Sequence, residues 1–332
     1  MNNSRRVYFY KLFIHAIMIF FGINLAGCDA PRINPYDPEN PNYAFATLEG
    51  SVQTFSLPYQ SIPGVTVLWA PANMIVNTDN NGAFKIFNIL PLNGKLIFQK
   101  NGYLADTINV TWGNSKMLNF QVNLNLIPQL DSISLYTVVI NEYTPPGQYS
   151  ELVINSRILD SDNDIDTVFV ENTKLNLKTA LPYNASNKIY EAVLSTQQLN
   201  VSNIEEIIGL SFNILTEDIF GREFNVGSSE ATRVITNGVS IQFPANDTTI
   251  SSSPDFTWQR YNTGYSFNYE IDIYTNDLAN PQLVYSAQNI SSDSISYQLS
   301  TPLSGRDYFW VIWVIDQFQN RSRSLPATFI VQ

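Results

Sequence analysis

The sequence predicts an all-β chain made of tandem β-sandwich domains, and three observations support this prediction. From Ala46 onward, short runs of alternating apolar and polar residues are separated by Gly, Pro, Asn and Asp, with no convincing amphipathic helix between them. The chain contains 20 Phe, 18 Tyr and 5 Trp, residue types that favour strands. Its length of 332 residues is sufficient for two or three domains.

The acidic balance of the chain argues against one class of partner. Its formal net charge is −11, and 14% of its residues are charged. Because no basic cluster offsets this charge, the chain repels nucleic-acid phosphates and gains nothing from an anionic membrane surface. We therefore expect no nucleic-acid partner.

Residues 1–27 have the composition of an export signal peptide. Arg5, Arg6 and Lys11 make its start basic, and an apolar run over 12–27 ends in small residues directly before Cys28. This run is shorter than the roughly 20 residues that a membrane-spanning helix needs. The composition therefore indicates export followed by removal of the segment.

The four residues Leu25-Ala26-Gly27-Cys28 resemble the lipobox of bacterial lipoproteins. The resemblance implies cleavage before Cys28, a diacylglycerol on its thiol and acylation of its new amine. Two or three acyl chains of this kind anchor a protein stably in the lipid bilayer. The alternative is an uncleaved signal anchor with an incidental cysteine. The chain has no second cysteine, so no disulfide can form within it.

Residues 28–45 are predicted to form the lipidated cysteine and a tether. Pro31, Pro35, Pro38 and Pro41 favour a stiff, extended chain of about 3.1 Å per residue. The segment is similar to the Pro-Tyr-Asp-Pro-type leaders of many surface lipoproteins. We therefore expect a lipid-anchored protein of the bacterial cell envelope, in the outer membrane or on the surface in preference to the inner membrane.

Residues 46–127 are predicted to form the first sandwich. Asn81-Gly82 predicts a hairpin between two alternating runs, because both residue types tolerate positive φ. The landmarks of this segment are 48–52, 64–67, 78–84 and 100–103. They resemble the carboxypeptidase regulatory-like domain, a transthyretin-like β-sandwich. The resemblance implies a non-catalytic spacer or docking unit.

Residues 128–238 and 239–332 are predicted to form two further sandwiches of related topology. Each closes with a strand, a turn that begins with aspartate and a last strand. These lie at 208–216, 218–222 and 231–236 in the second sandwich and at 308–315, 316–321 and 327–331 in the third. We interpret the second sandwich as Ig-like. A short helical turn is expected within 197–207, with Asn200 or Ser202 as its cap.

Two aromatic segments mark the third sandwich. Residues 254–258 (Pro-Asp-Phe-Thr-Trp) and 308–312 (Tyr-Phe-Trp-Val-Ile) resemble strands B and F of a fibronectin type III or immunoglobulin-like domain. In this resemblance Trp258 takes the place of a core tryptophan, and Tyr308 that of the corner tyrosine.

The predicted mature chain lacks two reactive groups. Its one histidine, His15, lies in the segment expected to be removed, and lipid occupies the thiol of Cys28. Ser-His-Asp and Cys-His catalysis are thereby excluded, as are histidine-ligated zinc and iron. A carboxylate-only hydrolase is the enzymatic alternative. Small sandwiches in series rarely form a deep cleft, so we expect that the chain is not an enzyme.

The best metal candidate is an acidic run that partly mimics a calcium-binding EF-hand loop. Ile165 stands where such a loop needs Gly for its sharp turn, and the following residues have the pattern of a strand. The alternative is a plain acidic turn with Asp162 to Asp164 at its tip. No other cofactor is expected, and the candidate calcium ligands are Asp160, Asp162, Asp164, Asp166 and Glu171.

The best ligand-binding surface lies in the third sandwich. If Tyr308 and Trp310 point into the core, the alternation of a strand turns the residues between them outward, and two neighbouring strands share this outer face. The face predicts a sugar-stacking platform or a protein-contact patch; the alternative is packing against a neighbouring domain or loop. Its predicted residues are Trp313, Phe309, Tyr274, Glu270 and Asp272.

These patterns favour a membrane-anchored lipoprotein that acts as a non-enzymatic spacer and binding module. A glycan-binding lipoprotein of a polysaccharide-uptake system is the second hypothesis, and a carboxylate-only hydrolase is the third. The expected partners are the lipid bilayer, through acylated Cys28, and either an envelope protein or a glycan.

Overall fold

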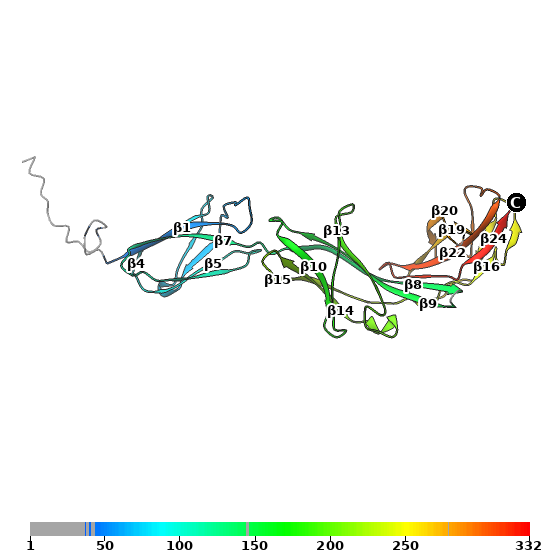
Figure 1. Ribbon diagram of the computed structural model, residues 1–332, viewed down its shortest axis with the longest axis horizontal. Coiled ribbons are helices and arrows are strands. Elements are labelled where there is room, and N and C mark those ends of the chain that lie inside the picture. The colour runs from blue at the N-terminus through cyan, green and yellow to red at the C-terminus, as the bar shows by residue number, and fades with distance from the viewer. Residues whose placement is uncertain (1–36, 38–39, 41–43, 144–145, 278) are drawn as a thin grey trace, which may run out of the picture. The chain divides into compact units, whose positions relative to one another are not determined.

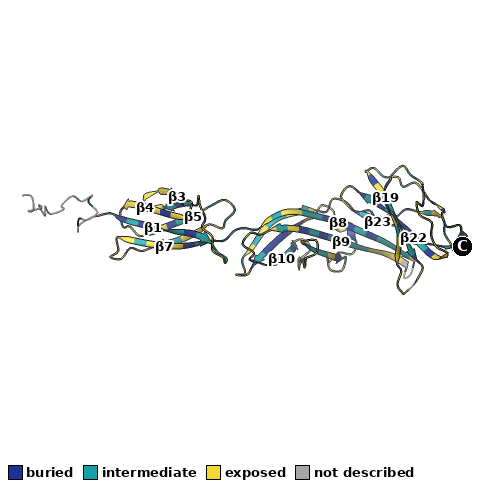
Figure 2. Cartoon of the chain, turned by 90° about the horizontal axis from the view of Figure 1, so that it is seen from above, coloured by how far each residue is buried: buried dark blue, intermediate teal, exposed yellow. Residues whose placement is uncertain are grey.

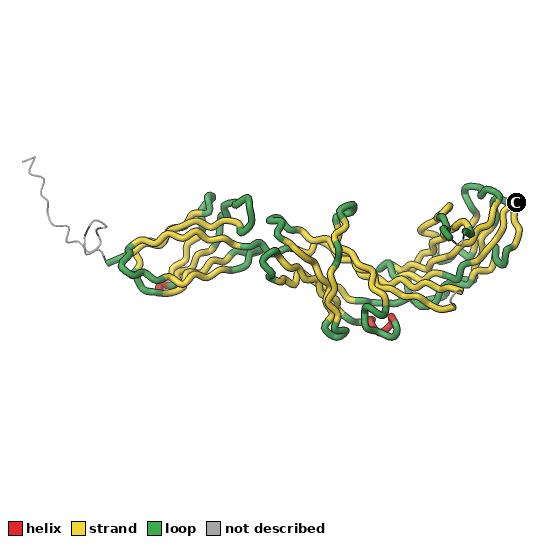
Figure 3. Tube along the Cα trace, in the orientation of Figure 1, coloured by secondary structure: helices red, strands yellow, loops and turns green. Residues whose placement is uncertain are grey.

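The computed structural model describes residues 37, 40, 44–143, 146–277 and 279–332. The predicted signal peptide, Cys28 and most of the tether lie outside these residues. Strands dominate the described chain, and its helical segments, η1 (Ala70–Ala72) and η2 (Ile204–Ile207), are single 3₁₀ turns (Figure 3). None of its helices is long and apolar enough to cross a membrane. The prediction of an all-β chain of tandem sandwiches is confirmed.

The chain divides into two compact units. One contains the residues up to Thr54 together with Tyr59–Leu124, and the other contains Phe55–Pro58 and Asn125–Gln332. The described residues form three hydrophobic cores, one in the first unit and two in the second.

The first unit is a sandwich of two sheets. One sheet has the order β4 (Ala83–Ile89), β1 (Ala46–Thr54), β7 (Met117–Leu124), in which β1 and β7 run parallel (Figure 1). The other has the order β3 (Met74–Asn77), β2 (Thr66–Trp69), β5 (Gly94–Gln99), β6 (Asp106–Val110). Alternate residues of these strands, such as Leu48, Val67, Trp69, Ile86 and Phe98, are buried between the sheets.

The turn at Asn81-Gly82 differs from the predicted hairpin. The Asp79 carboxylate accepts the N–H groups of Asn81 (2.8 Å) and Ala83 (2.9 Å), and only Gly82 of the predicted pair has a positive φ, of 72°. The strands on either side belong to different sheets, since β3 pairs with β2 and β4 pairs with β1. The turn was predicted correctly, but it passes the chain between the two layers.

The second sandwich consists of two sheets that share the core around Ile154, Val170 and Phe212. One sheet contains β12 (Tyr183–Asn184), β13 (Ile189–Ser195), β9 (Pro146–Leu159) and β8 (Gln129–Tyr143), in that order. The other contains β11 (Leu177–Ala180), β10 (Ile165–Asn172), β14 (Ser211–Asp218) and β15 (Glu223–Glu230).

The third sandwich repeats this strand order. Its smaller sheet contains β16 (Ile241–Phe243), β18 (Asp255–Trp258) and β21 (Ser296–Gln298). Its larger sheet contains β20 (Leu283–Ser291), β19 (Phe267–Thr275), β22 (Arg306–Asp316) and β24 (Ala327–Val331), and β17 (Thr248–Ile250) pairs with β24. The layer of β8, β9 and β13 in the second sandwich thus corresponds to that of β16, β18 and β21 in the third, as in Ig-like and fibronectin type III-like domains.

Two predicted landmarks of the third sandwich lie in its core. The Tyr308 hydroxyl donates to the backbone carbonyl of Ser304 at 2.9 Å, the hydrogen bond of a tyrosine corner. Trp258 is 1% exposed, and its ring meets that of Tyr269 edge to face. Buried residues alternate with less buried ones along part of β8 and of β22, and Figure 2 shows this colouring on the labelled strands.

Two local predictions for the second sandwich were wrong. Its last strand is β15, because the turn at Asp218–Arg222 returns the chain at once, and 231–236 is not a strand. The helical turn within 197–207 is η2, and its cap is Asn203 instead of Asn200 or Ser202. Asn203 and Glu206 form a reciprocal capping box, which the sequence shows as Asn-x-x-Glu.

A continuous sheet joins the second and third sandwiches. The segment β23 (Arg321–Arg323) pairs with β22 on one side and runs parallel to β8 on the other. Neighbouring strands of this sheet are therefore paired across both sandwiches, in the spatial order β12, β13, β9, β8, β23, β22, β19, β20. The long hairpin of β8 and β9 extends toward the third sandwich (Figure 1).

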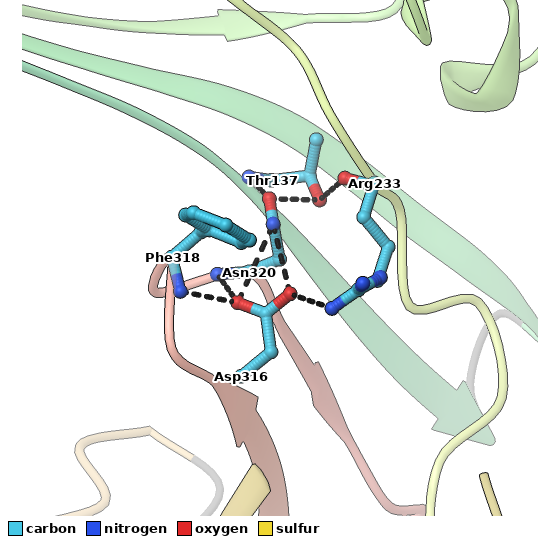
Figure 4. Close-up of polar contacts among 5 residues, drawn as sticks. All are labelled: Thr137, Arg233, Asp316, Phe318 and Asn320. Carbon is cyan, nitrogen blue, oxygen red and sulfur yellow. Dashed lines mark hydrogen bonds and ion pairs between the residues drawn. The ribbon is translucent and has the colours of Figure 1, made fainter. Parts of the chain in front are cut away.

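A buried polar cluster lies at this junction (Figure 4). The Asp316 carboxylate accepts hydrogen bonds from Arg233 (2.9 Å) and from the Asn320 side chain (3.1 Å). The Asn320 amide oxygen accepts the N–H of Thr137 on β8 at 2.9 Å. Asp316 is 3% exposed, so its charge is neutralised by Arg233 within the junction and not by water.

We expect Asp316→Ala to lower the free energy of unfolding of the second unit by about 3 kcal/mol, because removal of one partner leaves Arg233 without its ion pair. Denaturant unfolding followed by tryptophan fluorescence measures this loss. Asp293→Ala is the matched control, since the Asp293 carboxylate that pairs with Arg260 is 93% exposed. Equal losses in the two variants would show that the junction contributes no more than a surface ion pair.

Candidate functional site

The structure brings the five predicted patch residues together on one sheet face. Glu270, Asp272 and Tyr274 lie on β19, and the antiparallel register places them opposite Trp313, Val311 and Phe309 of β22. Tyr308, Trp310, Ile312 and Val314 are buried on the opposite, core side. We call this surface the outer face and define it by Trp313, Phe309, Tyr274, Glu270 and Asp272.

The side chains of the outer face contact one another closely. The Trp313 indole N–H donates to the Asp272 carboxylate at 3.0 Å. The rings of Tyr274 and Phe309 are stacked, with centroids 5.1 Å apart. Val311 lies between Phe309 and Trp313 in β22 and points to the same side, but it is fully buried. The outer face is therefore half-buried and does not present a freely exposed row of rings.

A cation covers part of the Trp313 ring. The Arg321 guanidinium of β23 lies 6.0 Å from the centroid of Trp313 and 5.5 Å from that of Tyr136, which comes from β8. Cations over aromatic rings are attracted by the ring quadrupole. The expected sugar-stacking surface of Trp313 is thus already in contact with a protein group from the junction.

A hollow of about 360 Å³ lies beside the outer face. It extends from Glu270 of the predicted patch toward the turn that follows β22. Its other lining residues share no pattern in the sequence, because they come from separate segments that meet only in the folded sheet. The polar and apolar groups that line it include Glu270, Asn268, Gln288, Ile315, Gln319 and Arg321.

Burial raises the pKa of Glu270 above its ordinary value, and the neighbouring Asp272 raises it further. Arg321 and Gln288 act in the opposite direction without cancelling the effect. Glu270 is thus a carboxylate whose charge is poorly solvated at the wall of the hollow. A ligand that donates hydrogen bonds to it would relieve part of this cost.

The acidic run forms a loop between β9 and β10. One oxygen of Asp160 accepts the N–H groups of Asp164 (2.9 Å) and Ile165 (3.1 Å), and Asn163 has a positive φ of 54°. The chain thereby turns without glycine at position 165. Carboxylate oxygens of Asp160, Asp162 and Asp164 lie within 4.8 Å of one another.

The two other predicted calcium ligands do not join this group. Asp166 is exposed and accepts a hydrogen bond from the Thr167 hydroxyl. Glu171 lies further along β10, where its backbone pairs with Lys178 and Asn213. The loop is therefore a three-carboxylate cluster that leads into a strand, unlike an EF-hand, in which the loop joins two helices.

Burial and neighbouring negative charges raise the pKa values of two aspartates in the acidic loop. Burial, followed by the neighbouring Asp160 and Asp164, raises the pKa of Asp162 to about 7. Burial also raises the pKa of Asp164, and Asp160 and Asp218 add to the shift. Arg222 and the Ser56 hydroxyl oppose this second shift.

Comparisons with known proteins leave the family of the chain open. No protein-family model matches it, and no curated protein matches its sequence. Among solved structures, the chain resembles fibronectin(III)-like modules of Clostridium thermocellum CbhA (11% identity, TM-score 0.27, 62% of this chain and 94% of that one). It also resembles the FN1–FN3 domains of chicken CNTN1 (10% identity, TM-score 0.30, 81% and 90%). A third is BcpA, the major pilin subunit of Bacillus cereus (11% identity, TM-score 0.26, 86% and 95%). Scores in this range do not establish a shared fold.

We expect Glu270→Gln to raise the thermal unfolding midpoint at pH 7.5. A raised pKa in the folded state means that ionisation of Glu270 costs stability as the pH rises through that value. Glutamine removes this cost, so the advantage of the variant should be present at pH 7.5. It should vanish near pH 3.5, below the ordinary glutamate pKa of about 4.3.

Glu230→Gln, at an exposed glutamate of β15, is the control and should leave the midpoint unchanged at both pH values. Calorimetry at the two pH values measures the differences. A lower midpoint for Glu270→Gln at pH 7.5 would mean that the ionised carboxylate stabilises the fold.

Proposed function

We propose that the chain is a lipid-anchored, non-enzymatic spacer and binding protein of the bacterial cell envelope. The observation that supports it best is the junction of the second unit, where one sheet and the buried ion pair of Asp316 and Arg233 join two sandwiches. A spacer has to hold its ends apart, and a shared sheet resists bending better than a flexible linker. The first sandwich fits this proposal as a transthyretin-like, non-catalytic unit.

The anchor in this proposal is Cys28, which follows a lipobox-like segment and is the one cysteine of the sequence. Acyl chains at that position would hold the chain at a bilayer, and a proline-rich tether would separate the first sandwich from it. The described residues contain no histidine and no cysteine, which supports a binding role over nucleophilic catalysis.

We expect Cys28→Ser to release the protein from the membrane fraction, because the variant has no thiol to acylate. Fractionation of cells, with mass spectrometry of the amino-terminal peptide, measures both the location and the acyl chains. Asn34→Ser, within the tether, is the control and should remain membrane-bound. An unmodified Cys28 in a wild-type protein that retains residues 1–27 would contradict the proposal.

Glycan binding is a second candidate, and the hollow beside Glu270 favours it. The amides of Asn268, Gln288 and Gln319 line this hollow together with Arg321. Amides offer both donors and acceptors, which suits a ligand covered with hydroxyl groups. Such a ligand could also donate to the poorly solvated carboxylate of Glu270.

Glycan-array screening of the purified protein tests this candidate. We expect Gln288→Ala to weaken the binding of any glycan that wild type retains by about tenfold, the loss of roughly one hydrogen bond in a polar site. Gln298→Ala, at an exposed position of β21 outside the hollow, should bind as wild type does. If neither the wild type nor its variants bind any glycan, the candidate is wrong and the spacer function stands alone.

A further inference from the structure

The loop between β9 and β10 concentrates carboxylate oxygens that have no hydrogen-bond partner. One oxygen of Asp160, one of Asp162 and both oxygens of Asp164 are buried without one. The remaining oxygen of Asp162 accepts the backbone N–H of Leu126 at 3.2 Å. That of Asp160 accepts the N–H groups that close the loop. The unpaired oxygens are therefore those that remain after Asp160 and Asp162 have accepted the backbone N–H groups of Asp164, Ile165 and Leu126.

Asp164 is the residue that a plain acidic turn does not explain. It is 1% exposed, and neither of its oxygens is paired in a hydrogen bond or an ion pair, although the nearby Ser56 hydroxyl and Arg222 favour its ionised form. Ligand atoms of Asp160 and Asp162 lie within 4.8 Å of its carboxylate. A buried carboxylate beside two others is strongly unfavourable unless a positive charge accompanies it.

No protein cation forms an ion pair with this cluster in the described part of the chain. Arg222, whose charge favours the ionised form of Asp164, directs its Nε to Asp218 at 2.7 Å. The ion pairs of the described residues include none with Asp160, Asp162 or Asp164. Full ionisation of the cluster would therefore need positive charge beyond that of Arg222, such as a bound cation.

We propose that Asp160, Asp162 and Asp164 form a calcium-binding site. The available ligand atoms are all carboxylate oxygens, which suit hard cations such as calcium, magnesium and manganese. Calcium accepts six to eight oxygens in irregular geometry and fills its sphere with waters, whereas magnesium demands a near-ideal octahedron. The loop offers oxygens from three residues at unequal depths, an arrangement that calcium tolerates better.

The site would order the start of the second unit. Leu126 is hydrogen-bonded to Asp162, and the side chain of Asn125 donates to Asp218 at 3.4 Å. Asn125 is 2% exposed, and its side-chain oxygen also has no hydrogen-bond partner. An ion held by Asp162 would therefore fix the loop, the segment 125–126 and the turn at Asp218 as one group.

The test is calcium titration of the full-length protein, purified in detergent and stripped of metal with a chelator. We expect saturable heat in isothermal titration calorimetry, with half-saturation between about 0.1 and 1 mM, the range of extracellular calcium modules. At 5 mM CaCl₂ the unfolding midpoint should rise by about 3 °C. MgCl₂ at the same concentration should have less than half of this effect.

Asp164→Asn is the decisive variant. It keeps the size of the side chain and removes an unpaired buried charge, so the variant should fold at least as well without metal. The calcium concentration at half-saturation should rise more than tenfold in this variant, and Asp162→Asn should show the same change. Asp166→Asn, which removes an adjacent exposed carboxylate outside the cluster, is the matched control and should keep the wild-type response.

Two results would overturn the proposal. One is a wild-type protein that shows no saturable heat and no shift up to 10 mM CaCl₂, or an equal shift in MgCl₂. The other is a calcium response of Asp164→Asn and Asp162→Asn that equals that of Asp166→Asn.

Discussion

The architecture of the second unit depends on how the Asp316 carboxylate is neutralised. This group accepts hydrogen bonds from Arg233, from the Asn320 side chain and from backbone N–H groups of its own turn. Asn320 in turn binds Thr137 of β8, so one carboxylate connects the third sandwich, the connecting segment and the second sandwich. A carboxylate left unpaired here would favour separation of the two sandwiches, because water would then solvate it.

One turn design recurs in all three sandwiches of the chain. Asp79, Asp218 and Asp316 each accept the N–H groups two and four residues later. The residue three positions after the aspartate has a positive φ in all three turns: Gly82, Gly221 and Gln319. In the second unit, the segment before each sandwich also donates to the turn aspartate, through Asn125 to Asp218 and through Arg233 to Asp316.

Local patterns were enough to predict most of the strands and the alternation along β22, which depend on a period of two residues. The tyrosine corner and the position of Trp313 near the carboxylates of β19 were predicted from the resemblance of the third sandwich to fibronectin type III or immunoglobulin-like domains. The hollow, the cover of Trp313 by Arg321 and the shared sheet could not be predicted in this way. They depend on β23, a strand of three residues with no hydrophobic signal that joins segments far apart in sequence.

The parallel pairing of β23 with β8 also removes a hazard of assembly. In a sheet that ended at β8, the backbone donors and acceptors of Val138–Ile140 would be left unpaired along its edge. Exposed strand edges of this kind recruit strands from other molecules. The short strand that joins the two sandwiches thus also covers this central part of the β8 edge.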